Sequence, residues 1–227
     1  MYKNLKISAV VPCYNEELGI AKVINSFPDF IDEIIVVDNN STDKTSEIAK
    51  SLGAKVIFEK RQGYGRAYKT GFKAVKNDII VTMDGDASYP ATPIQQMLDR
   101  LVDEKLDFIS AARMPLDWDK NKDNIKRFVG NKILSLMIMI LFKQNIEDSQ
   151  SGMWVFRSKV LDIVRIRSDG MPLSEELKIE AFCHPEIKSI EIPFQFKYQH
   201  REGSSKLNLW KDGFRNLLFL FQKKIFG

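Results

Sequence analysis

Two aspartates, Asp84 and Asp86, are separated by one glycine and follow the apolar run 79–83. Such a run is typical of a buried parallel strand, and open α/β sheets bind their ligands beyond the carboxyl ends of the strands. Two carboxylates this close repel one another unless a cation lies between them, and Mg²⁺ or Mn²⁺ takes oxygen ligands and bridges to substrate phosphates. Gly85 would let a ligand approach the backbone closely. Because Asp-Gly is also a common turn dipeptide, these residues alone support a metal site and a simple turn about equally.

The composition limits the classes of protein that can present such a pair. A chain of 227 residues with 44% hydrophobic and 28% charged residues predicts one globular α/β domain and excludes a disordered chain. The net charge of +4 is too small to indicate a nucleic-acid partner, although it permits an anionic ligand or a membrane surface. Cys13 and Cys183 are the only cysteines, which fits a reducing compartment and excludes a disulfide framework. The start of the chain leads directly into a strand, and no apolar run is long enough to span a bilayer, so we expect neither a signal peptide nor a membrane span.

Strands and helices alternate along the first half of the chain, with short connections between them. Asn15 is placed to cap the first helix, with Glu16 and Glu17 in its first turn, and Gly53 is placed to end the second helix. This alternation predicts a parallel sheet with right-handed crossovers, which is the pattern of a nucleotide-binding half-fold. The expected strands cover 7–12, 33–38, 55–59 and 79–83, and the expected helices cover 16–27, 44–52 and 63–76.

The second half continues in the same class, and no linker separates a second domain. We expect helices over 94–104, 125–142 and 174–183, strands over 106–112, 153–157 and 190–196, and a last helix over 207–226. The last helix combines large apolar residues with a basic rim. It either docks on the core or lies as an amphipathic helix on an anionic membrane, and we favour the membrane. The residues concerned are Trp210, Phe214, Leu217, Leu218, Phe221 and Ile225, with Lys211, Arg215, Lys223 and Lys224 beside them.

The predicted sheet gathers polar residues at the carboxyl ends of its strands. Neither a GxGxxG after the first strand nor a GxxxxGK[ST] is present, which disfavours a dinucleotide site or a P-loop. What remains is a site for a nucleotide whose diphosphate is held by a metal, and a nucleotide-sugar fits well. The gathered residues are Pro12, Tyr14 and Glu16 from the first strand, Asp38 and Asn39 from the second, Gly63 and Gly65 from the third connection, and Asp84 and Asp86 from the fourth strand.

Six segments, met in order along the chain, resemble motifs of the GT-A glycosyltransferases of family 2. The resemblance is greatest to the polyprenyl-phosphate sugar transferases, such as dolichol-phosphate mannosyl- and glucosyltransferases. It implies a single GT-A domain over 1–206, with a nucleotide-binding half over about 1–112, an acceptor half over 113–206 and an amphipathic helix over 207–227. The segments are VVPCYNEE (10–17), IVVDNNSTD (35–43), MDGD (83–86), GNK (130–132), DSQSG (148–152) and REGSSKL (201–207).

The resemblance implies a metal-dependent, inverting transfer of a sugar to a polyprenyl phosphate, either dolichyl or undecaprenyl. The donor would be a nucleotide-sugar of the UDP-glucose or GDP-mannose type, and Asp84 and Asp86 would hold Mg²⁺ or Mn²⁺. The enzyme would lie peripherally on the cytoplasmic face of a membrane, seated by the helices 125–142 and 207–226.

Individual residues receive roles from the same resemblance. Pro12, Tyr14, Glu16 and Asp38 would hold the base and ribose, while Asn39 stands where the family usually has a second aspartate. Asp86 would act on the diphosphate, and Arg127 and Arg201 would bind the acceptor phosphate. The other expected substrate contacts are Gly63, Gly65, Gly85, Arg113, Asn131, Ser135, Gln150, Glu176, Ser205 and Lys206.

The nature of the acceptor decides whether a base is needed. A phosphate monoester is largely a dianion at neutral pH, so it needs positioning, for which arginine is suited, more than deprotonation. If the acceptor is instead a sugar hydroxyl, Asp148 is the best candidate for the general base, with Gln150 in support. A nucleotide-sugar-binding module without catalysis is another alternative. A nucleotidyltransferase is disfavoured, because it would have a glycine-rich loop with a basic residue after the first strand.

Overall fold

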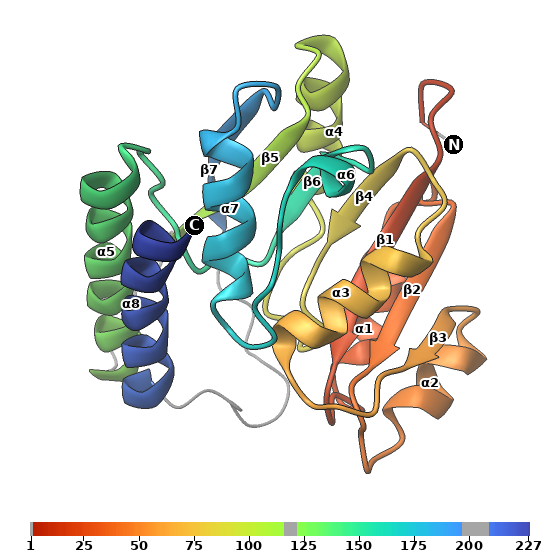
Figure 1. Ribbon diagram of the computed structural model, residues 1–227. Coiled ribbons are helices and arrows are strands. Elements are labelled where there is room, and N and C mark those ends of the chain that lie inside the picture. The colour runs from red at the N-terminus through yellow and green to blue at the C-terminus, as the bar shows by residue number, and fades with distance from the viewer. Residues whose placement is uncertain (1, 116–121, 197–208) are drawn as a thin grey trace.

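The computed structural model describes residues 2–115, 122–196 and 209–227, and within these ranges it contains one seven-stranded sheet. The strands lie in the order β3-β2-β1-β4-β6-β5-β7. Helices cover both faces of the sheet, and two further helices form a separate layer beside it (Figure 1). The strands are β1 (Ile7–Cys13), β2 (Glu33–Asp38), β3 (Lys55–Phe58), β4 (Ile79–Thr82), β5 (Phe108–Pro115), β6 (Trp154–Arg157) and β7 (Ser189–Phe196). The helices are α1 (Ile20–Ser26), α2 (Thr45–Ser51), α3 (Tyr64–Ala74), α4 (Pro93–Asp103), α5 (Lys122–Phe142), α6 (Val160–Ile163), α7 (Leu173–Cys183) and α8 (Leu209–Phe226).

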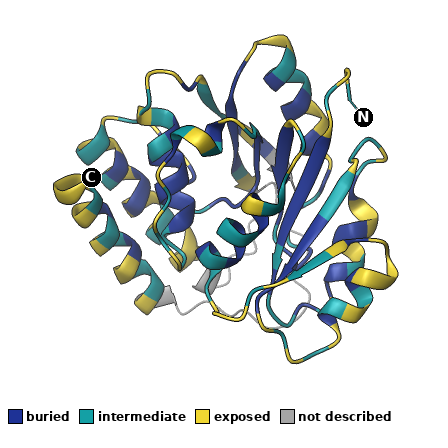
Figure 2. Cartoon of the chain, turned by 45° about the vertical axis from the view of Figure 1, so that its right-hand side comes forward, coloured by how far each residue is buried: buried dark blue, intermediate teal, exposed yellow. Residues whose placement is uncertain are grey.

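Two apolar clusters hold the helices to the sheet, one on each face. On one face, α1 and α4 pack through residues such as Ile20 and Met97. On the other face, α3 and α7 pack through residues such as Tyr68 and Leu177. The strands between them are dark blue in Figure 2, because they are buried on both sides. Continuous apolar runs therefore form the central strands, as the sequence predicts.

One strand runs against the others, and this places a loop at the edge that matters for function. β6 is antiparallel to both of its neighbours, β4 and β5. The pairs β3–β2, β2–β1 and β1–β4 are all parallel. The amino end of β6 therefore lies at the same edge as the carboxyl ends of β4 and β5. As a result, the segment 148–153 before β6 reaches the edge at which Asp84 follows β4. The expected sheet is confirmed as mostly parallel.

The first helix begins later than the sequence suggests, so the expected Asn15 cap is wrong. The backbone of Asn15 has a φ of 53°, and its Oδ1 accepts a hydrogen bond from the Thr42 amide at 2.7 Å. The Glu16 amide donates to Thr45 Oγ1 at 2.8 Å. These bonds tie the segment after β1 to the loop before α2, and α1 starts only at Ile20. Gly53, in contrast, ends α2 with a φ of 82°, as expected.

A layer made of α5 and α8 lies beside α7, at the left of Figure 1. Its interior is apolar and includes Leu134, Ile138 and Leu220. Among the described residues, no helix has the length and apolar character needed to cross a bilayer. The last helix thus docks on the rest of the chain through one side, while several of its apolar residues remain exposed.

The packing of α3 on the sheet predicts an unusual response to a helix substitution. A Cβ at Gly71 would lie 2.5 Å from Val10 Cγ1 and 2.9 Å from Val37 Cγ2, whereas a Cβ at Gly213 in α8 would meet nothing within 4 Å. Gly71→Ala should therefore lower the free energy of unfolding by about 1–3 kcal/mol through overpacking. Gly213→Ala, the matched control, should raise it by about 0.5–1 kcal/mol, because alanine favours helix. Urea unfolding followed by circular dichroism measures both. Equal stabilities of the two variants would contradict the close packing of α3 on β1 and β2.

Candidate active site

The carboxyl ends of β1, β2 and β4 bring the expected donor residues together. Asp84 follows β4, and the loop after it contacts the loop after β1: a Cβ at Gly85 would lie 2.5 Å from Cys13 Sγ and 3.2 Å from the Pro12 carbonyl oxygen. Only glycine fits here without displacing backbone. Of the expected donor residues, the buried ones are Glu16, Asp38, Asn39, Gly65, Gly85 and Asp86, and the half-buried ones are Pro12, Tyr14, Gly63 and Asp84.

Two tyrosines of α3 orient Asp84. The hydroxyls of Tyr64 and Tyr68 approach Asp84 Oδ1 at 3.3 and 3.5 Å. Burial raises the pKa of both phenols well above their usual range, and the charge of Asp84 adds to the effect, so both hydroxyls stay protonated and can donate. A Cβ at Gly152 would lie 2.5 Å from the Tyr64 hydroxyl and 3.1 Å from Asp84 Oδ1. Gly152 therefore leaves the space that Asp84 and the Tyr64 hydroxyl occupy.

Asp86 is held by a turn of its own. Its Oδ1 accepts a hydrogen bond from the Ser88 amide at 3.0 Å, and Ala87 between them has a φ of 59°. A residue with a side chain pays a conformational cost in this left-handed region, and such strain is concentrated at functional sites. The turn directs Asp86 towards the same edge of the sheet as Asp84.

Asp38 and Asn39 organise the two loops that border this edge. Asp38 Oδ1 accepts from the Ser41 amide at 2.8 Å, and Oδ2 accepts from the Ser46 hydroxyl. Asn39 Nδ2 donates to the carbonyls of Glu59 and Arg61 at 3.1 and 2.8 Å, and its Oδ1 accepts from the Gly63 amide at 2.7 Å. An aspartate could accept the last bond but could not donate the other two. Asparagine at this position therefore fastens the loop 59–63 to the end of β2.

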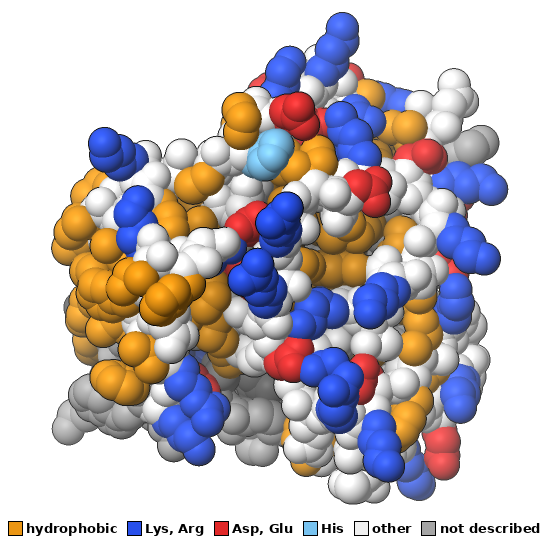
Figure 3. Space-filling view, viewed as in Figure 1, with side chains coloured by type: hydrophobic (Ala, Val, Ile, Leu, Met, Phe, Trp, Pro, Cys, Tyr) orange, Lys and Arg blue, Asp and Glu red, His pale blue; other side chains and the backbone are white. Residues whose placement is uncertain are grey.

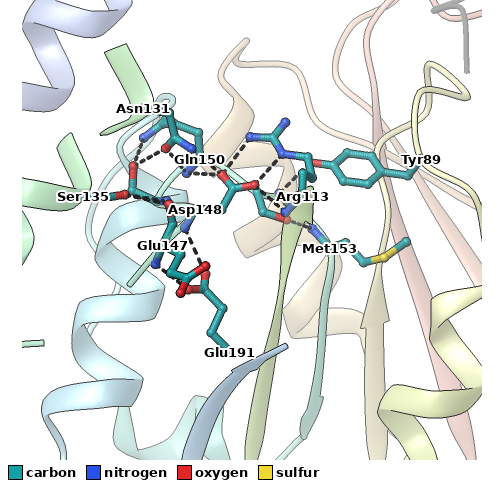
Figure 4. Close-up of polar contacts among 12 residues, drawn as sticks. Tyr89, Arg113, Asn131, Ser135, Glu147, Asp148, Gln150, Met153 and Glu191 are labelled. Carbon is teal, nitrogen blue, oxygen red and sulfur yellow. Dashed lines mark hydrogen bonds and ion pairs between the residues drawn. The ribbon is translucent and has the colours of Figure 1, made fainter. Parts of the chain in front are cut away.

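A second polar cluster surrounds Asp148 (Figure 4). The Arg113 side chain forms an ion pair with both carboxylate oxygens, through Nε at 2.6 Å and Nη2 at 2.9 Å, and its backbone amide donates at 3.0 Å. Asn131 Nδ2 donates to Oδ1 at 2.9 Å, and the Gln150 amide donates to the same oxygen at 3.2 Å. Asp148 is only 3% exposed, so these donors surround a buried charge.

This environment makes Asp148 a weak base. Burial alone would raise its pKa, but the adjacent Arg113 guanidinium and the Lys178 ammonium hold the pKa well below its usual range. A carboxylate that accepts several hydrogen bonds and is paired with a cation takes up a proton poorly. The geometry therefore argues against Asp148 as the general base and favours a role in positioning Arg113.

Asn131 and Ser135, both on α5, stabilise the turn at Asp148. Asn131 Oδ1 accepts from the Ser149 hydroxyl at 2.8 Å and the Gln150 amide at 3.3 Å. Ser135 Oγ donates to the Glu147 carbonyl at 3.2 Å. The structure shows these residues holding the turn together, and their expected contact with substrate stays a prediction. Arg127, one helical turn before Asn131, lies on an exposed part of α5.

Next to this turn, α7 contributes two buried titratable side chains, Lys178 and Glu175. Lys178 is fully buried, and its ammonium donates to the Asp148 carbonyl oxygen. Glu175, also fully buried, accepts from Gln150 Nε2 at 2.6 Å. Burial raises the pKa of Glu175 to about 8, although Lys178 and Gln150 partly oppose the shift.

The structure places Glu175, and not Glu176, beside Gln150, while the expected contact of Glu176 with substrate stays a prediction. Adjacent helical residues point in different directions, so only one of the two acids can face the turn at Asp148. Glu176 Oε2 instead accepts hydrogen bonds from the amides of Arg167 and Ser168 at 3.0 and 2.8 Å. Glu176 thus stabilises the loop before α7. The expectations for Arg201, Ser205 and Lys206 concern residues outside the described ranges.

One side chain and one glycine connect the two clusters. The Gly152 amide donates to the Tyr89 hydroxyl at 3.1 Å, and the Arg113 guanidinium lies over the Tyr89 ring at 5.8 Å from its centroid. The carbonyl of Gly152 accepts from Thr82 Oγ1 at 2.8 Å. The carboxylates after β4 and the ion pair at Asp148 therefore line one continuous edge of the sheet.

Sequence reasoning overlooked several residues of this site. Tyr64 and Tyr68 are four residues apart on a helix that follows a glycine-containing loop, and this spacing was a usable signal that both reach the same carboxylate. Lys178 carried no such signal, because burial of a lysine depends on the tertiary partners around it.

Comparison with known proteins identifies the family. A model of the family described as glycosyl transferase family 2 matches residues 8–164, which include both aspartates after β4 and the turn at Asp148. The chain belongs to glycosyl transferase family 2. The chain is therefore a glycosyltransferase, as the sequence motifs indicate.

Named relatives and a solved structure are similar to nearly the whole of this chain. A dolichyl-phosphate hexose transferase of Haloferax volcanii is 31% identical over 214 residues, which cover 91% of this chain and 89% of the relative. The low-salt glycan biosynthesis hexosyltransferase Agl6 of the same organism is 30% identical over 94% of this chain, and this chain spans only 52% of its length. The glucosyl-3-phosphoglycerate synthase of Mycobacterium tuberculosis, solved with Mn²⁺, UDP and phosphoglyceric acid, has a TM-score of 0.78 and 22% identity over 97% of this chain and 78% of that one. The last similarity supports the predicted α/β fold.

The buried acid of α7 predicts how stability depends on pH. The pKa of Glu175 is about 8 in the folded chain and roughly 4.3 in an unfolded one. Between these values the folded state holds a proton that the unfolded state has lost, so the free energy of unfolding should fall as the pH rises from 5 to 8. Glu175→Gln should reduce this slope by about one proton, since glutamine does not titrate.

Urea unfolding at several pH values measures the slope, with the exposed Glu186→Gln as the control. The control should keep the slope of the parent protein. If Glu175→Gln also kept it, Glu175 would be ionised in the folded state.

Proposed function

We propose that this family 2 glycosyltransferase transfers a sugar, with inversion, from a nucleotide-sugar to a polyprenyl phosphate. The names of two relatives support this acceptor: the dolichyl-phosphate hexose transferase, and a dolichol-phosphate mannosyltransferase of Pyrococcus furiosus that is 26% identical over 89% of this chain. This chain spans 52% of Agl6 and 59% of the dolichol-phosphate mannosyltransferase, so we base the proposed reaction on the geometry of the site.

Asp84 and Asp86 fit a divalent cation that is shared with the donor diphosphate. Three features support the fit: two carboxylates at one strand end, tyrosine hydroxyls that orient Asp84, and a glycine, Gly152, that leaves space beside Asp84. Within the described residues no cluster of three acidic, histidine or cysteine side chains could hold a metal. A site of two carboxylates is nevertheless typical for Mg²⁺, which takes its other ligands from phosphates and water. When bound, Mg²⁺ or Mn²⁺ supplies positive charge for the leaving diphosphate.

The base and ribose of the donor would lie between the loops after β1 and β2. Pro12, Tyr14 and Glu16 form one side of this region, and Asp38 forms the other, with Asn39 fixing the loop that contains Gly63. Because both Asp38 oxygens already accept bonds within their own loop, we propose that Asp38 shapes this wall and shares one oxygen with the base. The donor is of the UDP-glucose or GDP-mannose type.

The ion pair between Asp148 and Arg113 is the observation that favours a phosphate acceptor over a sugar hydroxyl. Its carboxylate is paired with Arg113 and its pKa is held low, so it is poorly suited to deprotonate a sugar hydroxyl. A lipid phosphate is mostly a dianion at neutral pH and needs no base. Arg113, oriented by Asp148 and Tyr89, and Arg127 on α5 would position the phosphate oxygens for attack on the anomeric carbon. Arg201 and Lys206 remain further candidates for this contact.

We also propose that the layer of α5 and α8 lies on a membrane surface, where the lipid acceptor resides. Apolar side chains gather over these helices in Figure 3, with basic side chains at the edges of the patch. Large apolar surfaces of this kind mark interaction sites, and a basic rim suits anionic lipids. The exposed apolar residues are Ile125, Phe128, Val129, Ile133, Leu136, Met139, Ile140, Phe214, Leu218, Phe221 and Ile225, and exposed basic residues nearby are Lys126, Lys132, Lys211 and Lys224.

Sugar transfer to a lipid phosphate tests the proposed reaction. Radiolabelled UDP- and GDP-sugars are incubated with polyprenyl phosphate in detergent, with Mg²⁺, with Mn²⁺ or with chelator. We expect metal-dependent label in the lipid fraction, reduced at least about a hundredfold in Asp86→Asn, because a neutral amide holds the cation poorly. Asp29→Asn, which alters an aspartate remote from the site, is the control.

Two results would redirect the proposal. Label that passes to a saccharide but not to the lipid would make a sugar hydroxyl the acceptor. Donor binding without transfer to either would make the chain a nucleotide-sugar-binding module.

Binding to lipid vesicles tests the membrane surface. Ile133 and Ile140 on α5 are 51% and 59% exposed, and Phe58 on β3 is 60% exposed but far from this layer. The double change Ile133→Asp and Ile140→Asp should weaken sedimentation with anionic vesicles by roughly tenfold or more, since it replaces apolar surface by charge. Phe58→Asp should bind vesicles as the parent does. Equal weakening by both changes would remove the assignment of the membrane surface to α5 and α8.

A further inference from the structure

A polar side chain of α8 reaches into the protein between apolar neighbours. Asn216 is 3% exposed and lies next to Leu217 and near Leu220, which pack on α5 and α7. Its Nδ2 donates to Gln150 Oε1 at 2.9 Å. This bond links α8 directly to the turn that contains Asp148.

Gln150 is the centre of this link. Its side-chain Nε2 donates to Glu175 Oε1 at 2.6 Å, while its backbone amide donates to Asp148 Oδ1 at 3.2 Å and Asn131 Oδ1 at 3.3 Å. One residue thus joins α5, α7, α8 and the turn at Asp148. The amide of Gln150 can satisfy both side-chain neighbours in only one orientation, because Asn216 offers it a donor and Glu175 offers it an acceptor.

If this link served only to dock α8, it would be an unfavourable way to stabilise the folded chain. Two oxygens of the group, Asn216 Oδ1 and Glu175 Oε2, are buried without a hydrogen-bond partner among the described residues. A buried unsatisfied polar atom is destabilising, and apolar side chains would dock α8 at lower cost. The arrangement is therefore better explained by what it holds in place than by the docking of α8.

We propose that Asn216 is a positioning residue that couples the placement of α8 to the active-site turn through Gln150. With α8 docked, Asn216 fixes the Gln150 amide, and the Gln150 backbone helps to hold the carboxylate that orients Arg113. Displacement of α8 removes the donor, so the Gln150 amide is no longer fixed and the turn at Asp148 loosens.

This inference rests on the proposed function for two points: that Arg113 serves the acceptor and that α8 lies on the membrane. Under this proposal α8 has two roles, because the helix that contacts lipid also holds the active-site turn through Asn216. The loops after β1 and β2 are joined by hydrogen bonds of their own, and Asp86 is held by the turn that follows β4, so the geometry of these residues should not depend on Asn216.

Asn216→Asp tests the link, because it removes the donor and keeps the shape of the side chain. The matched control is Gln222→Glu, the same amide-to-carboxylate change at an exposed position of α8. We expect Asn216→Asp to lower kcat/KM for polyprenyl phosphate at least about tenfold, with the KM for the nucleotide-sugar and sedimentation with vesicles as in the control. Asn216→Leu, an uncharged variant, should show the same separation. A parallel loss of donor affinity, vesicle binding and thermal stability would overturn the proposal, because it would show that Asn216 only holds α8 in place.

A measurement without acceptor keeps the test independent of the proposed reaction. The side-chain amide resonances of Gln150, assigned with Gln150→Leu, should move in Asn216→Asp and Asn216→Leu and stay in place in Gln222→Glu. If they moved while the parent protein transferred no sugar to lipid, the link would stand and the proposed acceptor would fall. If they stayed in place in every Asn216 variant, the link itself would be refuted.

Discussion

The antiparallel insertion of β6 between β4 and β5 is the constraint on which the site depends. In a sheet of parallel strands alone, the amino end of each strand lies at the edge opposite the ligands. Because β6 runs the other way, the segment before it lies at the carboxyl edge, where Gly152 meets Asp84 and Tyr64. The same segment places Asp148 near the carboxyl end of β5, where its carboxylate pairs with Arg113. One reversal of strand direction thus places the carboxylates after β4 beside the ion pair of Asp148 and Arg113.

Charge compensation then determines how each carboxylate of the site behaves. Asp148 is buried beside two cations, and its pKa is held low. Glu175 is buried as deeply, but its nearest cation, Lys178, donates to the Asp148 carbonyl and not to Glu175, and its pKa rises to about 8. Two acids that are close along one hydrogen-bonded chain therefore differ in protonation at neutral pH. The charged one orients an arginine, and the neutral one accepts a bond from Gln150 at little electrostatic cost.

The periodic parts of the chain could be predicted from its sequence, and the parts that depend on tertiary partners could not. The strands and most helices follow apolar runs and glycines, so their positions, and the gathering of Asp38, Asp84 and Asp86, were foreseeable. The late start of α1 was not, because the Asn15 side chain is engaged by a loop that is distant in sequence. The choice between Glu175 and Glu176 likewise depends on the rotation of α7 about its own axis, which its tertiary packing sets.

α8 carries apolar residues both on its inner side and on part of its outer side. Leu217 and Leu220 face α5 and α7, while Phe214, Leu218 and Phe221 face outwards and are 68%, 46% and 41% exposed. A helix that only covered a core would carry polar residues on its outer side. Asn216, polar and buried, and its exposed apolar neighbours invert that pattern. The inversion is expected when the outer side meets an apolar phase and the inner side meets a polar site. The same helix can then be sensitive to both, because a single hydrogen bond to Gln150 is all that joins its polar group to the turn at Asp148.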